Sequence, residues 1–222
     1  MNQQEQVKHR ISIPKYTLGE ELISAISHGV GALLGIAALV LCIVKSCNPF
    51  DGYKLASSIV YGLTVTLLYL MSCLYHSLKV NKAKRVFRVI DHCTIFLLIA
   101  GTYTPYTLVA LRGTLGWWIF GIIWGIAILG IVLNAVNLKK FAKLSVACYL
   151  IMGWIIVFAY QYMVQVMHPT ALSLLIWGGI AYTVGAVLYA IGSKKKYFHS
   201  VFHFFCLAGT ILHFFSIYLY VL

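Results

Sequence analysis

Long apolar stretches, separated by short polar or basic segments, run along nearly the whole chain. A helix needs about 20 predominantly apolar residues to cross the hydrocarbon core of a bilayer, and these stretches have about that length. The pattern therefore predicts an all-α integral membrane protein built as a seven-helix bundle. The predicted spans are residues 22–44, 55–78, 89–111, 115–138, 144–166, 171–192 and 197–222.

Two of these boundaries depend on single breaks in the pattern. Residues 144–193 contain no Lys, Arg, Asp or Glu, which is too long for one crossing, and we divide them at Met167-His168-Pro169-Thr170. Pro105 lies inside the third span and predicts a kink there. Two small-residue pairs, Gly31/Gly35 and Gly121/Gly125, predict close helix packing within the bundle.

The basic residues are distributed unequally between alternate connections. Of the 17 Lys and Arg residues, 14 fall in the N-terminal tail and the second, fourth and sixth loops. Lys and Arg concentrate on the cytoplasmic side of membrane proteins, so the bias predicts a cytoplasmic N-terminus and an external C-terminus. Residues 1–20 are expected to form a cytoplasmic tail, and residues 21–222 the transmembrane domain.

The composition agrees with an integral membrane protein and favours lipids over nucleic acids as its partners. The chain of 222 residues is 61% hydrophobic and only 10% charged, far from the usual balance of a soluble protein. Its net charge of +12 lies in short clusters between apolar spans, which indicates contact with anionic lipid headgroups rather than nucleic acid. The six cysteines lack C-x-x-C spacing and are interpreted as small buried hydrophobes.

Ionisable residues inside the spans are the candidates for chemistry, because such groups are costly in hydrocarbon and usually have a partner. His199 and His203 are spaced i, i+4 and share one helical face, as in helical metal sites. The predicted topology places His76 and Asp91 in the same cytoplasmic leaflet. Three neutral histidines and one carboxylate form a plausible ligand set for Zn²⁺, with a fourth position open to water.

The roles of the neighbouring polar residues are open at this stage. Asp91 is either a direct ligand or a general base that contacts a metal-bound water. Ser72, four residues before His76, either orients a ligand ring, bonds a substrate carbonyl, or bonds its own helix.

A second group of residues is predicted to surround the ligands or to lie apart from them. Glu21 and His28 share a helical face and form either a second shell of the site or an interfacial hydrogen bond. His213, about 15 Å beyond His203 along its helix, is included in the second shell. His92 and His168 are expected not to bind the metal.

The combined motifs resemble the hemolysin III family, the bacterial branch of the progestin and adipoQ receptor superfamily. The resemblance runs from Glu20 to Leu222. The motifs that carry it are Glu20-Glu21…His28-Gly29, Ser72-x-x-x-His76, Asp91-His92, Ala100-Gly101-Thr102-Tyr103-Thr104-Pro105, and His199-x-x-x-His203 with His213. One departure is Ser24, which stands where related sequences often have Asn.

The resemblance implies a fold, a metal site and a range of functions. It implies a seven-helix bundle in the bacterial plasma membrane and a zinc ion held by His76, His199 and His203. Asp91 would contact this ion through water, with Ser72 close by. Animal members look like zinc-dependent amidases acting on ceramide, and bacterial members are linked to cytolysis and membrane-lipid homeostasis.

Three functions are therefore weighed. The first is a membrane-embedded zinc-dependent hydrolase that cleaves a lipid amide or ester, with Asp91 and Ser72 as its catalytic residues. The second is a cytolysin or pore, against which the confinement of the polar groups to one leaflet argues. The third is a receptor or sensor of lipid state with a structural zinc. Membrane lipids are the expected partners in each case.

Overall fold

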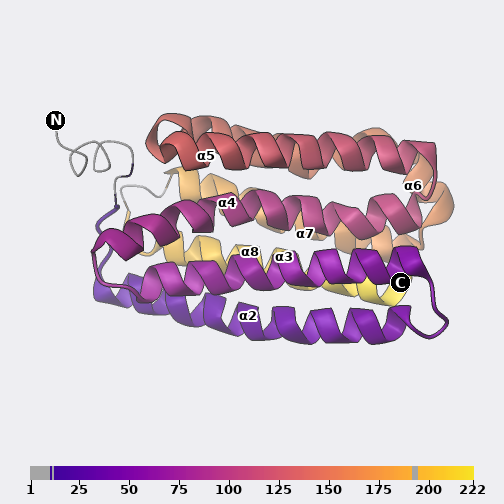
Figure 1. The fold of residues 1–222 in the computed structure, drawn as a ribbon, viewed down its shortest axis with the longest axis horizontal. Helices are drawn as coiled ribbons and strands as arrows, with labels where there is room; N and C mark the ends of the chain where they lie inside the picture. Colours follow the sequence, from indigo (N-terminus) through magenta and orange to yellow (C-terminus); the bar gives the residue numbers. More distant parts are fainter. Residues whose placement is uncertain (1–10, 12, 192–194) are drawn as a thin grey trace.

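The computed structural model describes residues 11, 13–191 and 195–222, and over these residues the chain forms a helical bundle without β-strands (Figure 1). The predicted all-α class is confirmed. In chain order the elements are α2 (Leu18–Ser46), α3 (Gly52–Ser77), α4 (Lys82–Pro105), the π-helix η1 (Tyr106–Ala110), α5 (Thr114–Trp154), the 3₁₀-helix η2 (Ile155–Ala159), α6 (Tyr160–Val166), α7 (Pro169–Ile191), α8 (Phe198–Ser216) and the π-helix η4 (Ile217–Val221).

The long helices pack in chain order around the bundle, and the order closes on itself. In order, α2 contacts α3, α3 contacts α4 and α4 contacts α5. Beyond these, α5 contacts α7, α7 contacts α8, and α8 packs back against α2. The first and last helices of the bundle are therefore neighbours. This closure brings residues near position 20 next to residues near position 200.

Polar caps set where several helices begin. In a capping box before α2, Glu20 N donates to Thr17 Oγ1 and Thr17 N donates to Glu20 Oε2, at 3.3 and 2.8 Å. Asp51 caps α3, and Asn81 caps α4 by accepting from Lys84 N at 2.8 Å. These caps lie outside the apolar stretches, so α2, α3 and α4 begin several residues earlier than the predicted spans.

The chain reverses within α5. Asn137 has non-helical dihedral angles, φ −159° and ψ 87°. Ser145 Oγ donates to Asn134 Oδ1 at 2.6 Å, and Asn134 Nδ2 donates to Tyr149 OH at 3.4 Å. Eleven residues of straight helix extend about 16 Å, so these bonds require the chain to fold back at Asn137. The break lies at the predicted end of the fourth span.

Six helical segments in the described part of the chain are long and apolar enough to cross a membrane. One of them, Thr114–Val166, has 53 residues and would extend about 80 Å if straight, far beyond the ~30 Å hydrocarbon core. The predicted break near Pro169 is present, since α6 ends at Val166 and α7 begins at Pro169. The helix also changes from α to π type directly after Pro105.

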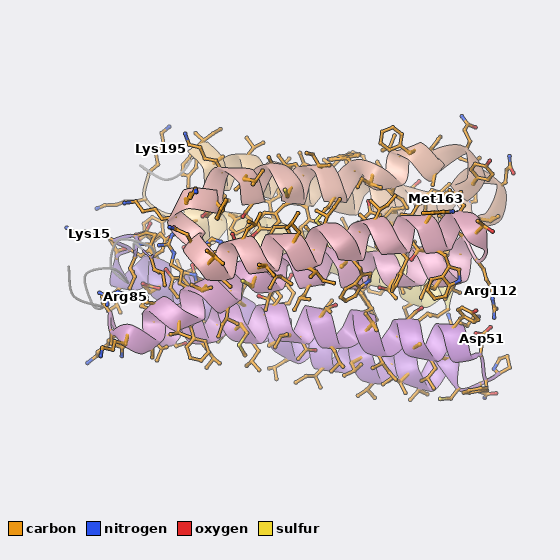
Figure 2. All side chains as sticks on the ribbon, turned by 45° about the horizontal axis from the view of Figure 1, so that its top comes forward. Lys15, Asp51, Arg85, Arg112, Met163 and Lys195 are labelled. Carbon is orange, nitrogen blue, oxygen red and sulfur yellow. The ribbon has the colours of Figure 1, made fainter. Side chains whose placement is uncertain are left out.

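Charged side chains lie at the two ends of the bundle, and its flanks are apolar. Figure 2 shows Lys15, Arg85 and Lys195 at one end and Asp51 and Arg112 at the other. Arg112 Nη1 donates to Asp51 Oδ2 at 2.9 Å. Large apolar side chains are exposed along the flanks, as expected of a surface that faces lipid.

The two predicted glycine pairs behave differently. A Cβ on Gly35 would come within 2.9 to 3.1 Å of Thr66 side-chain and backbone atoms, and one on Gly31 within 2.5 Å of Tyr69. These glycines allow α2 to approach α3 closely. At Gly121 and Gly125 a Cβ would meet no atom of the described chain within 4 Å, so the prediction that this pair packs within the bundle is wrong.

Candidate metal centre

Three histidines from two neighbouring parts of the bundle converge. His76 lies near the end of α3, and His199 and His203 occupy the first two turns of α8. His199 Nε2 lies 3.2 Å from His76 Nε2 and 3.1 Å from His203 Nε2. The ligand atoms of all three lie within 4.8 Å of one another, with His76 and His203 buried and His199 half-buried.

This arrangement fits a zinc ion by both distance and chemistry. Tetrahedral zinc with Zn–N bonds of about 2.0–2.1 Å separates its nitrogen ligands by about 3.3 Å. The two Nε2–Nε2 distances above are close to that value. Three imidazole nitrogens within 4.8 Å of one another also match the donor set that zinc prefers, and three protein ligands leave one position open.

Glu21 on α2 orients the His76 ring. Glu21 Oε2 lies 2.7 Å from His76 Nδ1, and Glu21 Oε1 accepts from Lys84 Nζ at 2.6 Å. A carboxylate on Nδ1 fixes the proton there and leaves the Nε2 lone pair free for a metal. Lys84 is buried and also donates to the Leu78 carbonyl at 2.9 Å. Glu21 therefore contacts His76, and among the described residues no hydrogen bond joins it to His28, which was one of the two alternatives for this pair.

His28 and Tyr16 cover the histidine group from two sides. The His28 ring stacks on His203 with centroids 3.7 Å apart, and meets Tyr69 edge-on at 4.9 Å. Tyr16, which precedes α2, stacks on His199 with centroids 4.8 Å apart and an interplanar angle of 14°. Burial raises the pKa of Tyr16 well above its ordinary value, so its phenol stays neutral.

Asp91 lies outside the group of three histidines and lines the same cavity as His199 and His203. Its carboxylate lies beside Ser72 and near His76 and Arg88. Ser72 is buried, and within the described residues no hydrogen bond joins its hydroxyl to its own helix. Asp91 and Ser72 both line the cavity next to His199 and His203. A carboxylate and a hydroxyl are thus presented to the same space as the histidines.

The remaining predicted histidines lie elsewhere. His213 Nε2 lies 3.0 Å from the Leu175 carbonyl on α7, and the ring contacts Tyr106 and Tyr182 instead of the three ligands. Its expected place around the metal ligands is therefore wrong: ten residues separate it from His203 on one straight helix. His168 stacks on Tyr220 at 4.9 Å. His92 faces Tyr189 with centroids 6.4 Å apart, apart from the ligand group.

The start of α8 is fixed against α2 by hydrogen bonds. Tyr197 has a left-handed backbone, with φ 65°, and its N–H donates to Glu20 Oε1 at 2.7 Å. Ser200 Oγ donates to the Glu20 carbonyl at 3.2 Å and lies 3.3 Å from Ser24 Oγ. These contacts hold the first turn of α8, which carries His199, at a defined position over α2. Ser24, the departure from the family pattern, takes part in this contact.

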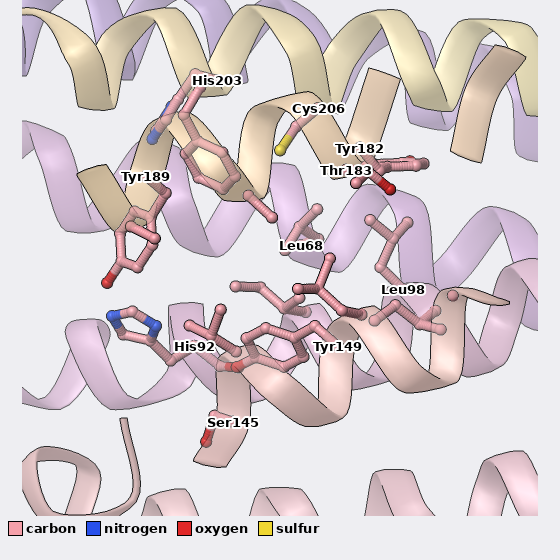
Figure 3. Close-up of a pocket in the computed structure, with 18 of the residues that line it drawn as sticks. Leu68, His92, Leu98, Ser145, Tyr149, Tyr182, Thr183, Tyr189, His203 and Cys206 are labelled. Carbon is pink, nitrogen blue, oxygen red and sulfur yellow. The ribbon is translucent and has the colours of Figure 1, made fainter. Parts of the chain in front are cut away.

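A cavity of about 970 Å³ extends from the histidines into the bundle between α4, α5, α7 and α8. Figure 3 shows His92, Tyr189 and His203 at one end, with Leu68, Leu98 and Cys206 farther along. Most of its surface is apolar. Such a volume is at the upper end for small-molecule sites and suits a ligand with a long apolar part.

Sequence reasoning missed two residues of this site. Lys84 belongs to a basic run that was interpreted only as a topology signal, and Tyr16 lies in a polar tail without periodicity. The one available signal was the position of Lys84 seven residues before Asp91, about two helical turns away on the same face.

The family described as Haemolysin-III related matches residues 16–214. The chain is 41% identical to Hemolysin-3 of Bacillus cereus over 203 residues, covering 91% of this chain and 92% of the relative. It is 40% identical to the Hemolysin-3 homolog of Bacillus subtilis (strain 168) over 205 residues, covering 92% and 96%.

A more distant similarity reaches animal proteins. The chain is 24% identical to the human Monocyte to macrophage differentiation factor over 178 residues, covering 77% of this chain and 72% of that protein. No solved structure matches the chain.

Proposed function

This chain belongs to the haemolysin III family, and on that premise we propose that it is a zinc-dependent hydrolase of a lipid amide or ester in the bacterial plasma membrane. The observation that carries the proposal is the convergence of three histidine Nε2 atoms beside a largely apolar cavity that Asp91 and Ser72 also line. The site thus combines nitrogen donors for a metal, a carboxylate for proton transfer and an apolar surface that can bind an acyl chain.

The protein residues have distinct roles in this proposal. His76, His199 and His203 hold the ion, and Glu21 keeps the His76 ring in the ligating orientation. When bound, zinc supplies Lewis acidity, which polarises a carbonyl group and makes water a better nucleophile at neutral pH.

Asp91 and Ser72 act on the substrate in this proposal. Asp91 accepts a proton from the attacking water and returns it to the leaving amine or alkoxide, so that one water is consumed per bond cleaved. Ser72 positions the Asp91 carboxylate or donates to the substrate carbonyl. The apolar cavity wall binds the acyl chain and excludes bulk water from the reaction.

The proposal includes the membrane topology. We expect seven crossings, with residues 1–20 as a cytoplasmic tail and the C-terminus outside. The reversal at Asn137 divides the longest apolar segment into two crossings of ordinary length and supports this count. The separation of Lys15, Arg85 and Lys195 from Arg112 at opposite ends of the bundle supports the orientation. Reporter fusions after Leu222 and in the loop at 79–81 test it.

A sensor with a structural zinc is the second candidate, and one observation favours it. The histidine group connects three helices. His76 on α3 contacts Glu21 on α2 and His199 on α8, which also carries His203. An ion at their centre would join three helices and respond to changes in their packing. The cytolysis suggested by the name of the Bacillus cereus relative has less support, because the cavity is apolar over most of its surface.

The test combines metal content with turnover. Purified wild-type protein should contain close to one zinc per chain and hydrolyse a ceramide-like amide or an ester lipid. His76→Ala and His203→Ala should lose both properties, whereas the matched control His168→Ala should keep both. Full zinc occupancy in the two ligand variants would contradict the site. Wild-type protein that holds zinc but hydrolyses no lipid amide or ester would end the hydrolase proposal in favour of the sensor.

A further inference from the structure

Six cationic side chains line the cavity at the end that holds the histidines. They come from four separate parts of the chain: Lys15, Arg88, Lys139, Lys143, Lys195 and Lys196. We refer to these six residues as the basic rim. Among the residues that the structure describes, two carboxylates line the same cavity, those of Glu20 and Asp91.

Which basic residues belong to the rim depends on where their side chains point, and not only on the side of the membrane on which they lie. On α4, Arg88 lines the cavity while Arg85, one turn earlier, does not. On α5, Lys139 and Lys143 are spaced i, i+4 and both line the cavity, whereas the intervening Lys140 is exposed elsewhere and lies over Phe141. The cytoplasmic charge bias accounts for all of these residues being at this end, but not for which of them face the cavity.

The two carboxylates leave most of this charge uncompensated. Glu20 already accepts hydrogen bonds from Thr17 and from Tyr197 N. Asp91 lies beside Ser72 and near His76 and Arg88, and Glu20 lies near Lys196, so the two carboxylates can offset at most two of the six rim charges. Among the described residues, no carboxylate lies within 4.0 Å of a basic-rim nitrogen, since the ion pairs there involve Lys84, His76 and Arg112. The basic rim is therefore available to an anion from outside the chain.

The basic rim also lies close to the reacting groups. Arg88 precedes Asp91 by three residues, a rise of about 4.5 Å along the helix. Lys195 and Lys196 directly precede the helix that carries His199 and His203. An anionic group bound at the rim would therefore lie near a second group of the same ligand held at the histidines. The apolar chain of that ligand would extend into the cavity.

We propose that the lipid bound in this cavity carries a phosphate group, which the basic rim binds while the acyl chain occupies the apolar part. The inference rests on the proposed function and narrows its substrate class from lipid amides and esters in general to phosphate-bearing lipids, such as glycerophospholipid esters. In these lipids the ester and the phosphate are separated by a short glycerol unit, which matches the closeness of Asp91 to Arg88. Several cations around one anion suit the multiple oxygens of phosphate.

The binding test uses two fluorescent probes with identical acyl chains: phosphatidic acid, which carries a phosphate, and diacylglycerol, which does not. The protein is held in uncharged, phosphate-free maltoside micelles as the His76→Ala variant, so that zinc itself does not attract the phosphate. Phosphatidic acid should bind about tenfold more tightly, and the preference should decrease with rising salt. Arg88→Gln and the double variant Lys139→Gln/Lys143→Gln should remove most of the preference. The matched controls Arg85→Gln and Lys140→Gln should leave it unchanged.

The outcomes separate this inference from its alternatives. Equal binding of both probes would overturn it, as would an equal loss in the control variants, which would indicate general surface charge. Inorganic phosphate in about 100-fold excess should fail to displace the lipid probe, and displacement at equal concentration would mean that the site recognises free phosphate. Selective binding by a wild-type protein that hydrolyses no lipid would leave this inference standing and reject the hydrolase. Turnover of a neutral amide lipid, with no preference for charged lipids, would support the hydrolase and reject this inference.

Discussion

Glu21 Oε2 lies 2.7 Å from His76 Nδ1, so a carboxylate on α2 sets the orientation of a ring on α3 that belongs to the candidate metal centre. The other oxygen of the same carboxylate accepts from the buried Lys84 at 2.6 Å. The cation keeps the carboxylate ionised and in place, and the carboxylate keeps the His76 Nε2 lone pair directed at His199. Stability of the ligand group therefore depends on two residues that do not touch the metal position.

Glu21→Gln tests this dependence. The amide keeps the size of the side chain but loses the charge that pairs with Lys84 and fixes the proton on His76. Zinc affinity should decrease by about 10- to 100-fold, a usual effect of residues behind metal ligands. Competition with a chelator of known affinity measures it. Asp51→Asn, which removes an acid at the opposite end of the bundle, is the control and should bind zinc like the wild type.

Asp91→Asn separates catalysis from structure. The amide retains shape but cannot accept a proton, so lipid hydrolysis should decrease by about 10²-fold or more. Zinc content should remain close to that of the wild type, because Asp91 lies outside the three ligands. Loss of zinc in this variant would instead make Asp91 a direct ligand. Unchanged turnover would exclude it as the general base.

Tyr16 gives a prediction about pH. Burial raises its pKa above the ordinary value of 10.0, so the unfolded chain ionises first as the pH increases. The stabilising contribution of buried Tyr16 is therefore fully present below pH 10.0 and is lost progressively above it. Thermal unfolding of wild type and Tyr16→Phe should differ by a constant amount up to pH 10.0 and diverge above it, with the wild type losing more stability. Parallel curves throughout would show that Tyr16 is solvated.

The glycine pairs provide a comparison within one protein. Gly35→Ala should lower the free energy of unfolding by about 1–3 kcal/mol, because the new methyl group meets the Thr66 backbone. Gly121→Ala and Gly125→Ala should instead raise it by up to about 1 kcal/mol, since no atom of the described chain lies within 4 Å of the added carbon and alanine is the better helix former. Unfolding in mixed micelles measures all three. A large loss at Gly121 would point to a contact outside this chain.

The sequence carries enough information for the helices and for part of the site. Apolar length and breaking residues located the helices, and the interval between His199 and His203 placed two ligands on one face. Loop charges then assigned a shared depth to His76. Each of these inferences uses a property that is local along the chain or follows from alternation across the membrane.

The contacts between helices could not be obtained in this way. Periodicity placed Glu21 and His28 on one face of α2, but it does not say which helices that face meets: Glu21 contacts α3, while His28 stacks on α8. In the sequence Lys84 resembles the other basic residues of its loop. Its burial depends on the position of Glu21 in space, which the sequence does not give. The sequence gives the distance of His213 from His203 along one helix, but not its partner, the Leu175 carbonyl.

The separation of 123 positions between His76 and His199 has a consequence for biogenesis. At a synthesis rate of about 5–20 residues per second, roughly 6–25 s pass between the emergence of the first ligand and that of the second. A ribosome-bound chain in that interval has one histidine of the group in the bilayer and no means of holding an ion there. If the proposed site holds zinc, metal loading follows insertion of the last helix, and the bound ion then marks a chain whose assembly is complete.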